Sequence, residues 1–160
     1  MKNSHIYEVY KVVSIILIAD QISKLLISTK MILNQEIVLI PKVFSILYVK
    51  NTGAAFSILQ NSSTLLTIIN VVFIVILHSL IKKEKNLTKL NCIFLGLIMG
   101  GMFGNLLDRI IHHGVIDFIY IKIINFPVFN IADIGITLGV VLLLISSIID
   151  KKKQIKNNKN

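Results

Sequence analysis

The sequence predicts an all-α membrane protein with four transmembrane helices and a small exoplasmic β-sheet element between the first and second helices. The chain of 160 residues is 54% hydrophobic with a mean hydropathy of +0.79, values that soluble domains rarely reach. Its apolar residues also fall into four runs, each with the roughly 17–20 residues that a bilayer crossing requires. We therefore expect residues 1–160 to form a single integral membrane domain.

The first span is predicted at about residues 9–27 and contains polar side chains at Asp20, Gln21 and Lys24. No small-residue cleavage pattern follows it, which favours a retained helix over a signal peptide. Asp20 and Lys24 are four residues apart, so on a helix they share a face and can form an ion pair.

Residues 28–64 form a predicted exoplasmic segment. Within it, Ile37–Val49 is rich in Ile, Val, Leu, Phe and Tyr, with Pro41 as a break. This composition is typical of strands, and the run is too short and too interrupted to cross a bilayer. We expect a short strand pair that lies on or just above the membrane.

The remaining spans are predicted at residues 65–81, 90–109 and 131–149. Asn70 and His78 are the strongly polar interruptions of the second span. The third span ends with glycines and polar residues on one helical face, at spacings of three and four. Glycines let another helix approach closely and an amide can hydrogen bond across the contact, so packing is one interpretation of this face and a functional site is another. The residues of this face are Gly101, Gly104, Asn105 and Asp108.

The basic residues indicate an orientation and exclude one class of partner. Lys and Arg total 17 against 8 Asp and Glu, for a net charge of +9. Most lysines lie in the N-terminal segment, the loop between spans two and three, and the tail 151–160, which we expect to be disordered. The positive-inside rule then puts both termini in the cytoplasm. Basic residues without interleaved aromatic rings favour anionic membrane lipids and argue against nucleic acid.

This topology gathers four acids at the exoplasmic face. They are Asp20 in span one, Asp108 at the end of span three, Asp117 in the following connection and Asp133 at the start of span four. A carboxylate near hydrocarbon costs roughly 3 kcal/mol even on mild scales, so function or a specific partner must retain it. Two carboxyl groups that can meet, Asp117 and Asp133, suggest a pair that shares one proton, as in aspartic proteases.

Each aspartate also has a simpler interpretation. Asp133 is placed to be an N-cap or first-turn acid favoured by the helix dipole, and Asp117 to be a loop acid near Arg109 or Lys122. Both together, beside Asn105 and Asp108, favour a site. His112 and His113 are adjacent to each other, and neither they nor Cys92 have the sequence spacing that metal sites require. We therefore expect no metal.

Five polar blocks follow one another along the chain. They are Asp20-Gln21-x-x-Lys24, Asn51-x-Gly53-Ala54-Ala55-Phe56, Gly100-Gly101-x-x-Gly104-Asn105-x-x-Asp108-Arg109, Val115-x-Asp117-Phe118 and Phe129-Asn130-x-Ala132-Asp133. In this order they resemble the signature blocks of bacterial lipoprotein signal peptidase, also called signal peptidase II. Each block alone is weakly specific, whereas five in order with this topology are highly specific.

The resemblance implies an aspartic endopeptidase of the bacterial cytoplasmic membrane with its active site on the exoplasmic side. The family removes signal peptides from prolipoproteins, cutting before a cysteine that carries a diacylglyceryl group, and cyclic peptide antibiotics inhibit it. No cofactor is implied. Asp117 and Asp133 match the catalytic pair by position. Asn51, Asn105, Arg109 and Asn130 match residues that line or support the site, and Asp20, Lys24 and Asp108 match polar residues of the same cluster.

The chemistry of two close carboxyl groups fits this activity. The ionised one takes a proton from water, which attacks the scissile carbonyl, and the protonated one donates to the carbonyl oxygen. We expect the small residues Gly53, Ala54 and Gly104 to leave room for the lipid-bearing chain of the substrate.

Two other functions remain open from the sequence. A small transporter with a proton-coupled acid cluster would also carry intramembrane acids, but it should have polar groups through its full depth. A non-catalytic membrane scaffold would use the polar residues only as contacts between helices.

Overall fold

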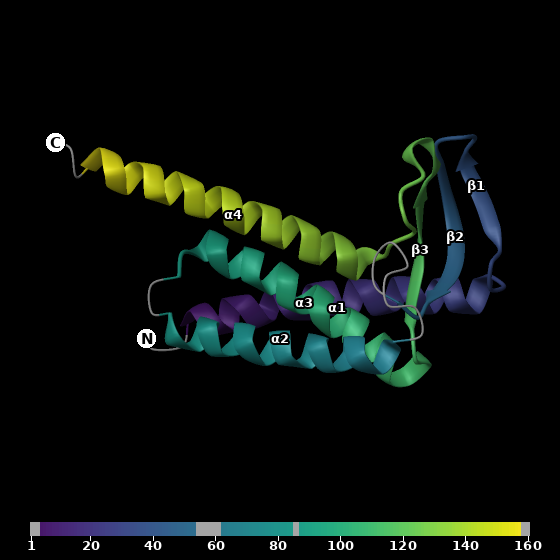
Figure 1. Cartoon of the computed structure of the whole chain (residues 1–160), viewed down its shortest axis with the longest axis horizontal. Helices are drawn as coiled ribbons and strands as arrows, with labels where there is room; N and C mark the ends of the chain where they lie inside the picture. The colour runs from purple at the N-terminus through teal and green to yellow at the C-terminus, as the bar shows by residue number, and fades with distance from the viewer. Residues whose placement is uncertain (1–3, 54–61, 85–86, 158–160) are drawn as a thin grey trace.

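The computed structural model describes residues 4–53, 62–84 and 87–157 and confirms the predicted fold class. Its long helices are α1 (Ser4–Lys30), α2 (Ser63–Lys83), α3 (Lys89–His112) and α4 (Ile131–Asn157). All four are long and apolar enough to cross a membrane by length and composition. The helices run lengthwise beside one another, and a small sheet stands across one end, where α4 begins (Figure 1). We call this the sheet end and the opposite end the tail end.

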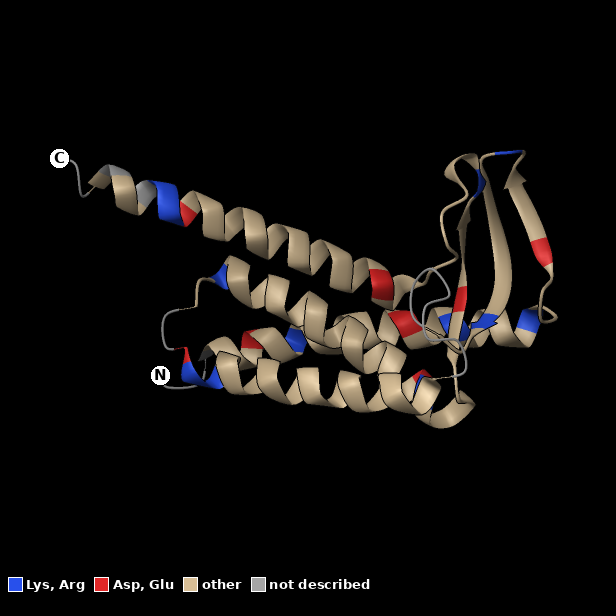
Figure 2. Cartoon of the chain, viewed as in Figure 1, with Lys and Arg blue, Asp and Glu red and all other residues tan. Residues whose placement is uncertain are grey.

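Helices α1, α2 and α3 extend beyond the predicted spans at both ends, and α4 extends at its C-terminal end. The prediction of a disordered tail is wrong for residues 151–157, and residues 158–160 lie outside the described part of the chain. Helix α4 continues through the lysine-rich segment to Asn157. Lys and Gln have high helix propensity, and the segment contains neither Gly nor Pro to end the helix. Charged residues gather toward the two ends of the helices and leave a mostly uncharged middle (Figure 2).

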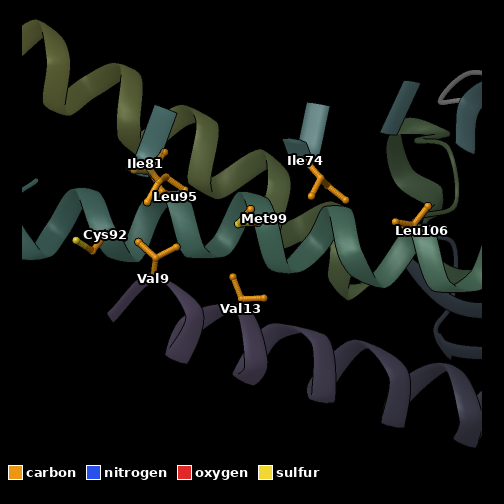
Figure 3. Packing of buried hydrophobic residues seen from close by; sticks show 8 residues of the cluster. All are labelled: Val9, Val13, Ile74, Ile81, Cys92, Leu95, Met99 and Leu106. Carbon is orange, nitrogen blue, oxygen red and sulfur yellow. The ribbon is translucent and has the colours of Figure 1, made fainter. Parts of the chain in front are cut away.

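Helix α3 lies at the centre of the bundle and packs against α1, α2 and α4. The main cluster of buried apolar side chains comes from α1, α2 and α3 and surrounds Met99, which is completely buried (Figure 3). The polar interruptions of α2 are satisfied by these neighbours. Asn70 Nδ2 donates to the carbonyl oxygen of Met102 at 3.0 Å, and His78 Nδ1 lies 2.7 Å from the Tyr10 hydroxyl.

The predicted strand pair is confirmed as β1 (Glu36–Ile40) and β2 (Phe44–Asn51), an antiparallel hairpin. The sheet also contains a third strand, where the sequence predicts a connection between α3 and α4. Strand β3 (Val115–Ile121) pairs antiparallel with β2 and is followed by the 3-10 helix η2 (Lys122–Ile124). Asp117 therefore lies on a strand, opposite Val49 of β2, and the loop interpretation of Asp117 is wrong.

Two glycines of α3 allow α1 and α4 to approach at the sheet end. A side chain added at Gly101 would collide with the backbone carbonyl oxygen of Ala132 in the first turn of α4. A side chain added at Gly104 would collide with the Asp20 carboxylate of α1 and lie 3.3 Å from Ala132 Cβ. The first contact is with backbone, which cannot rotate away, so Gly101 sets the distance between α3 and α4 beside Asp133.

Replacing Gly101 with alanine is expected to lower the thermal unfolding midpoint in detergent. Overpacking of a tight contact costs typically about 1–3 kcal/mol, and here it displaces the turn that carries Asp133. The control is Ile111→Ala, because Ile111 is exposed at the surface of the same helix. Equal unfolding midpoints for the two variants would contradict the role of Gly101 in helix spacing.

Candidate active site

A pocket of about 890 Å³ opens between the sheet and the sheet ends of α3 and α4. It collects residues that are far apart in the sequence, and its lining contains polar residues and apolar residues, which we call the polar wall and the apolar wall. Asn51, Gly53, Asn105, Arg109, Asp117 and Asp133 belong to the polar wall. Val49, Val115, Phe126, Pro127, Val128, Phe129, Ile134, Ile136 and Leu138 belong to the apolar wall.

Asp133 is positioned by the N-terminal cap of α4. The Asn130 side-chain oxygen accepts a hydrogen bond from Asp133 N at 2.9 Å, and Asp133 Oδ2 accepts one from Asn130 N at 3.1 Å. This reciprocal pattern is a capping box in which Asp takes the place of the usual Glu or Gln. Asp133 is therefore both a capping residue and part of the pocket lining. Its second oxygen, Oδ1, accepts a hydrogen bond from Asn105 Nδ2 at 2.8 Å.

Asp117 is positioned by β3 and is only 2% exposed. Its Oδ2 accepts a hydrogen bond from Asn51 Nδ2 at 3.0 Å, and its Oδ1 accepts one from Asn130 Nδ2 at 2.7 Å. Burial raises the pKa of Asp117 to about 7, and the neighbouring Asp133 carboxylate contributes to the rise, against the two amide donors that lower it. Asp117 is thus a carboxyl group that keeps its proton near neutral pH.

Three asparagine amides donate to the two aspartates, and each has its orientation fixed by a donor at its oxygen. The Oδ1 of Asn51 accepts from Gly53 N at 3.0 Å, and the Oδ1 of Asn130 accepts from Asp133 N. The Oδ1 of Asn105 accepts from Lys24 Nζ at 3.0 Å. Each Nδ2 is consequently turned toward a carboxylate, which is the arrangement that can stabilise a pair of acids in a buried site.

A buried ionic cluster lies directly behind the pocket and joins α1 to α3. Lys24 Nζ lies 2.8 Å from Asp20 Oδ2 and 2.9 Å from Asp108 Oδ2, which confirms the predicted pairing of Asp20 with Lys24. Asp108 Oδ2 also accepts a hydrogen bond from Ile116 N of β3 at 3.0 Å. Asp20 Oδ1 accepts one from Ala132 N of α4 at 2.9 Å. The cluster therefore braces the strand of Asp117 and the helix of Asp133.

Arg109 lies at the edge of the polar wall. Its Nη1 donates to the backbone carbonyl oxygen of Asn105 at 3.4 Å, and its charge interacts with Asp133, Asp117 and Asp108. The guanidinium carries five N–H donors in a fixed plane, so Arg109 can also offer donors to a carbonyl group held in the pocket.

The structure brings together nearly all of the predicted site residues, with two qualifications. Gly104 faces Asp20 and Ala132 rather than the pocket, so the expectation that it leaves room for substrate is wrong. Ala54 lies outside the described residues. Within the described part of the chain, no group of three or more His, Cys, Asp and Glu residues is arranged to hold a metal ion.

Gln21 is a site residue to which the sequence analysis assigns no role. Its Nε2 lies 3.1 Å from Asp20 Oδ2, 3.1 Å from Asp108 Oδ1 and 3.3 Å from the Gly104 carbonyl oxygen. Its position next to Asp20 and three residues before Lys24 is the signal that could have assigned it to the same cluster. The apolar wall, by contrast, has no polar signal in the sequence.

Replacing Asp108 with asparagine is expected to slow the reaction of this site by about 10- to 100-fold without abolishing it, a range typical of residues that orient a functional group. The introduced amide can still accept from Ile116 N through its oxygen but loses the ionic contact with Lys24. Initial rates of substrate cleavage measure the effect, with Asp150→Asn at the exposed tail end of α4 as control. A folded Asp108→Asn variant as inactive as Asp117→Asn would contradict the supporting role.

Comparisons with known proteins give a consistent identification. Residues 12–149 match the family described as signal peptidase (SPase) II. The fold is similar to that of a bacterial membrane enzyme solved by the in meso method at 2.3 Å resolution, with 32% identity and a TM-score of 0.83 over 91% of this chain and 90% of that one. A second bacterial membrane enzyme structure, at 1.9 Å, shows 31% identity and a TM-score of 0.78 over 86% and 90% of the two chains.

The matched range, residues 12–149, includes the ionic cluster of α1 and α3, the sheet and the start of α4, so it contains every element of the site. These matches favour an enzyme over the transporter and the scaffold that the sequence alone left open. The chain is a multi-pass membrane protein that belongs to the signal peptidase II family, an aspartic protease family that processes lipoprotein signal peptides.

Proposed function

We propose that this protein removes the signal peptide of prolipoproteins by cutting before the cysteine that carries the diacylglyceryl group. We propose Asp117 and Asp133 as its catalytic pair. The observation that carries the proposal is the network of amide donors, which directs N–H groups at both carboxyl groups in one pocket. Two carboxyl groups held this way share a proton, which is the requirement of aspartic proteolysis.

The two aspartates differ in environment, and the difference assigns their roles. Asp117 is buried and keeps its proton to about pH 7, so it donates to the oxygen of the scissile carbonyl. Asp133 lies in the first turn of α4, where the helix dipole favours a negative charge, so it takes the proton from the attacking water. The proton then returns to the departing amine as the roles reverse. These steps use the carboxyl groups alone, and a chelator is expected to leave the rate unchanged.

The walls of the pocket suit a substrate that is part peptide and part lipid. Much of the apolar wall is formed by Phe126–Phe129 and by Ile134, Ile136 and Leu138 of α4, and it lines the same pocket as the two carboxyl groups. A peptide carbonyl can reach the polar wall while the attached acyl chains stay in the bilayer. The lysines of the loop between α2 and α3 and of the tail support cytoplasmic termini and a pocket on the exoplasmic side. A cyclic peptide antibiotic is expected to compete for this pocket.

The test is cleavage of a purified prolipoprotein in detergent, with the mass of each product measured. The expected products are the free signal peptide and a protein that begins with the diacylglyceryl cysteine. The matched control is the same precursor without its lipid, which should be cut far more slowly. Cleavage at a different bond, or equal rates for both precursors, would contradict the proposed specificity.

A further inference from the structure

Lys24 makes a contact that an ion pair alone does not require. The residue is 2% exposed, and its Nζ lies near Asp20 Oδ2, Asp108 Oδ2 and Asn105 Oδ1, at 2.8, 2.9 and 3.0 Å. The first two contacts neutralise the charge. In the third contact the remaining ammonium hydrogen is donated to a neutral amide, that of Asn105, which lines the pocket.

This contact determines how the Asn105 amide is turned. An ammonium group can only donate, so the Asn105 atom that faces it must be the oxygen. The Nδ2 group then points the other way and donates to Asp133 Oδ1 at 2.8 Å. With the opposite orientation, an amide N–H would face Lys24 and an oxygen lone pair would face the carboxylate of Asp133.

The same contact also orders the amide of Asn130. Asn105 Oδ1 accepts a second hydrogen bond, from Asn130 Nδ2 at 3.1 Å, and that Nδ2 donates to Asp117 Oδ1 at 2.7 Å. One buried cation therefore acts on both members of the pair through two amides. Asp133 is affected more directly, since it is one amide away from Lys24 and Asp117 is two.

We propose that Lys24 is a positioning residue that, by fixing the orientation of Asn105, keeps Asp133 as the ionised member of the aspartate pair. The inference rests on the proposed function of that pair. Asp133 receives an N–H donor at each carboxylate oxygen, from Asn105 and from the backbone of Asn130, and donors to the ionised form favour it. Removing the constraint at Asn105 removes one of the two donors.

The charged groups around Asp133 allow a test in which the net charge stays constant. Lys24→Met alone would leave the buried carboxylates of Asp20 and Asp108 without the cation that pairs with both, so Asp20→Asn is added to remove one charge of the opposite sign. Arg109 of α3 and Asp117 of β3 interact electrostatically with Asp133, and the other ionisable groups of the surrounding elements are those of the ionic cluster, Asp20 and Lys24 of α1 and Asp108 of α3.

The measurement is the pH profile of kcat/KM for the Lys24→Met/Asp20→Asn variant. The acidic limb belongs to the coupled pair, and loss of an N–H donor to the ionised form of that pair should move the acidic limb to higher pH. Asp20→Asn alone keeps the contact between Lys24 and Asn105, and its acidic limb should not move to higher pH. An unchanged acidic limb in the double variant would overturn the inference.

A second variant keeps the inference testable should the double variant fail to fold. Asn105→Ala leaves Lys24 paired with Asp20 and Asp108, and it should produce the same shift of the acidic limb. Combined with the double variant, it should add no further shift, because Lys24 acts through Asn105. An acidic limb that stays in place in Asn105→Ala would also overturn the inference. Activity in Asp133→Asn would contradict the proposed catalytic pair. That result differs from an unmoved acidic limb, which would contradict only the role of Lys24.

Discussion

Replacing Asp117 or Asp133 with asparagine is expected to abolish cleavage of a diacylglyceryl prolipoprotein while the protein stays folded in the membrane. An amide keeps the size of the side chain and much of its hydrogen bonding. It can neither take a proton from water nor share one with the other aspartate. Either change should lower the rate by at least about 10³-fold, and the double change should be little worse, because the two groups act as one unit.

The folded state of these variants can be checked independently of activity. Asp117 is buried and its raised pKa of about 7 means that ionisation at alkaline pH opposes folding, whereas asparagine carries no charge there. At pH 8 the Asp117→Asn variant should therefore unfold at a temperature no lower than that of the wild type. Cleavage at a wild-type rate by either single variant would refute the aspartic mechanism.

The rate of cleavage is expected to fall about tenfold for each pH unit above about 7. Asp117 must be protonated to donate to the substrate carbonyl, and its pKa of about 7 places the loss of that proton in this range. A pair that needs one proton gives a bell-shaped profile, and the two limbs of that profile belong to the coupled pair. Initial rates at saturating and at low substrate concentration separate the profile of kcat from that of kcat/KM.

Asn51 provides a directional check on the basic limb. Its hydrogen bond to Asp117 Oδ2 favours the ionised form and lowers the pKa of Asp117, so Asn51→Ala should raise that pKa. The basic limb of Asn51→Ala should consequently move to higher pH, while the acidic limb stays in place. A basic limb that moves to lower pH, or no basic limb at all, would contradict the assignment of Asp117 as the acid.

The helices could be predicted from the sequence because hydropathy and length are local properties. Their ends could not, since polar residues such as the lysines after Asp150 continue a helix as well as apolar ones do. Strand β3 was missed for a different reason. Its partner β2 lies far away in the chain, so the pairing of Asp117 with Val49 has no local signature, and a single aspartate in an apolar run resembles a loop.

The gathering of the polar site residues at one end of the bundle could be predicted, but the contacts between them could not. The spacing of Asp20 and Lys24 gives their ion pair directly, because both lie on one face of one helix. That Lys24 also reaches Asp108 and Asn105 depends on the approach of α1 to α3 at Gly104, which requires the packed structure. The orientation of each asparagine side-chain amide likewise depends on the residues that surround it in the folded protein.

Titration of the aspartate carboxyl groups in the resting protein tests the central claim most directly, since a proton-sharing pair must show it before any substrate binds. The protein would be labelled with ¹³C at the aspartate carboxyl carbons, and the Asp117 signal assigned by its loss in Asp117→Asn. The account predicts that this carboxyl group titrates near pH 7 and that its titration moves to lower pH in Asp133→Asn, where the neighbouring charge is removed. An Asp117 signal that titrates near the ordinary aspartate value of about 4 and is indifferent to Asp133→Asn would contradict the account.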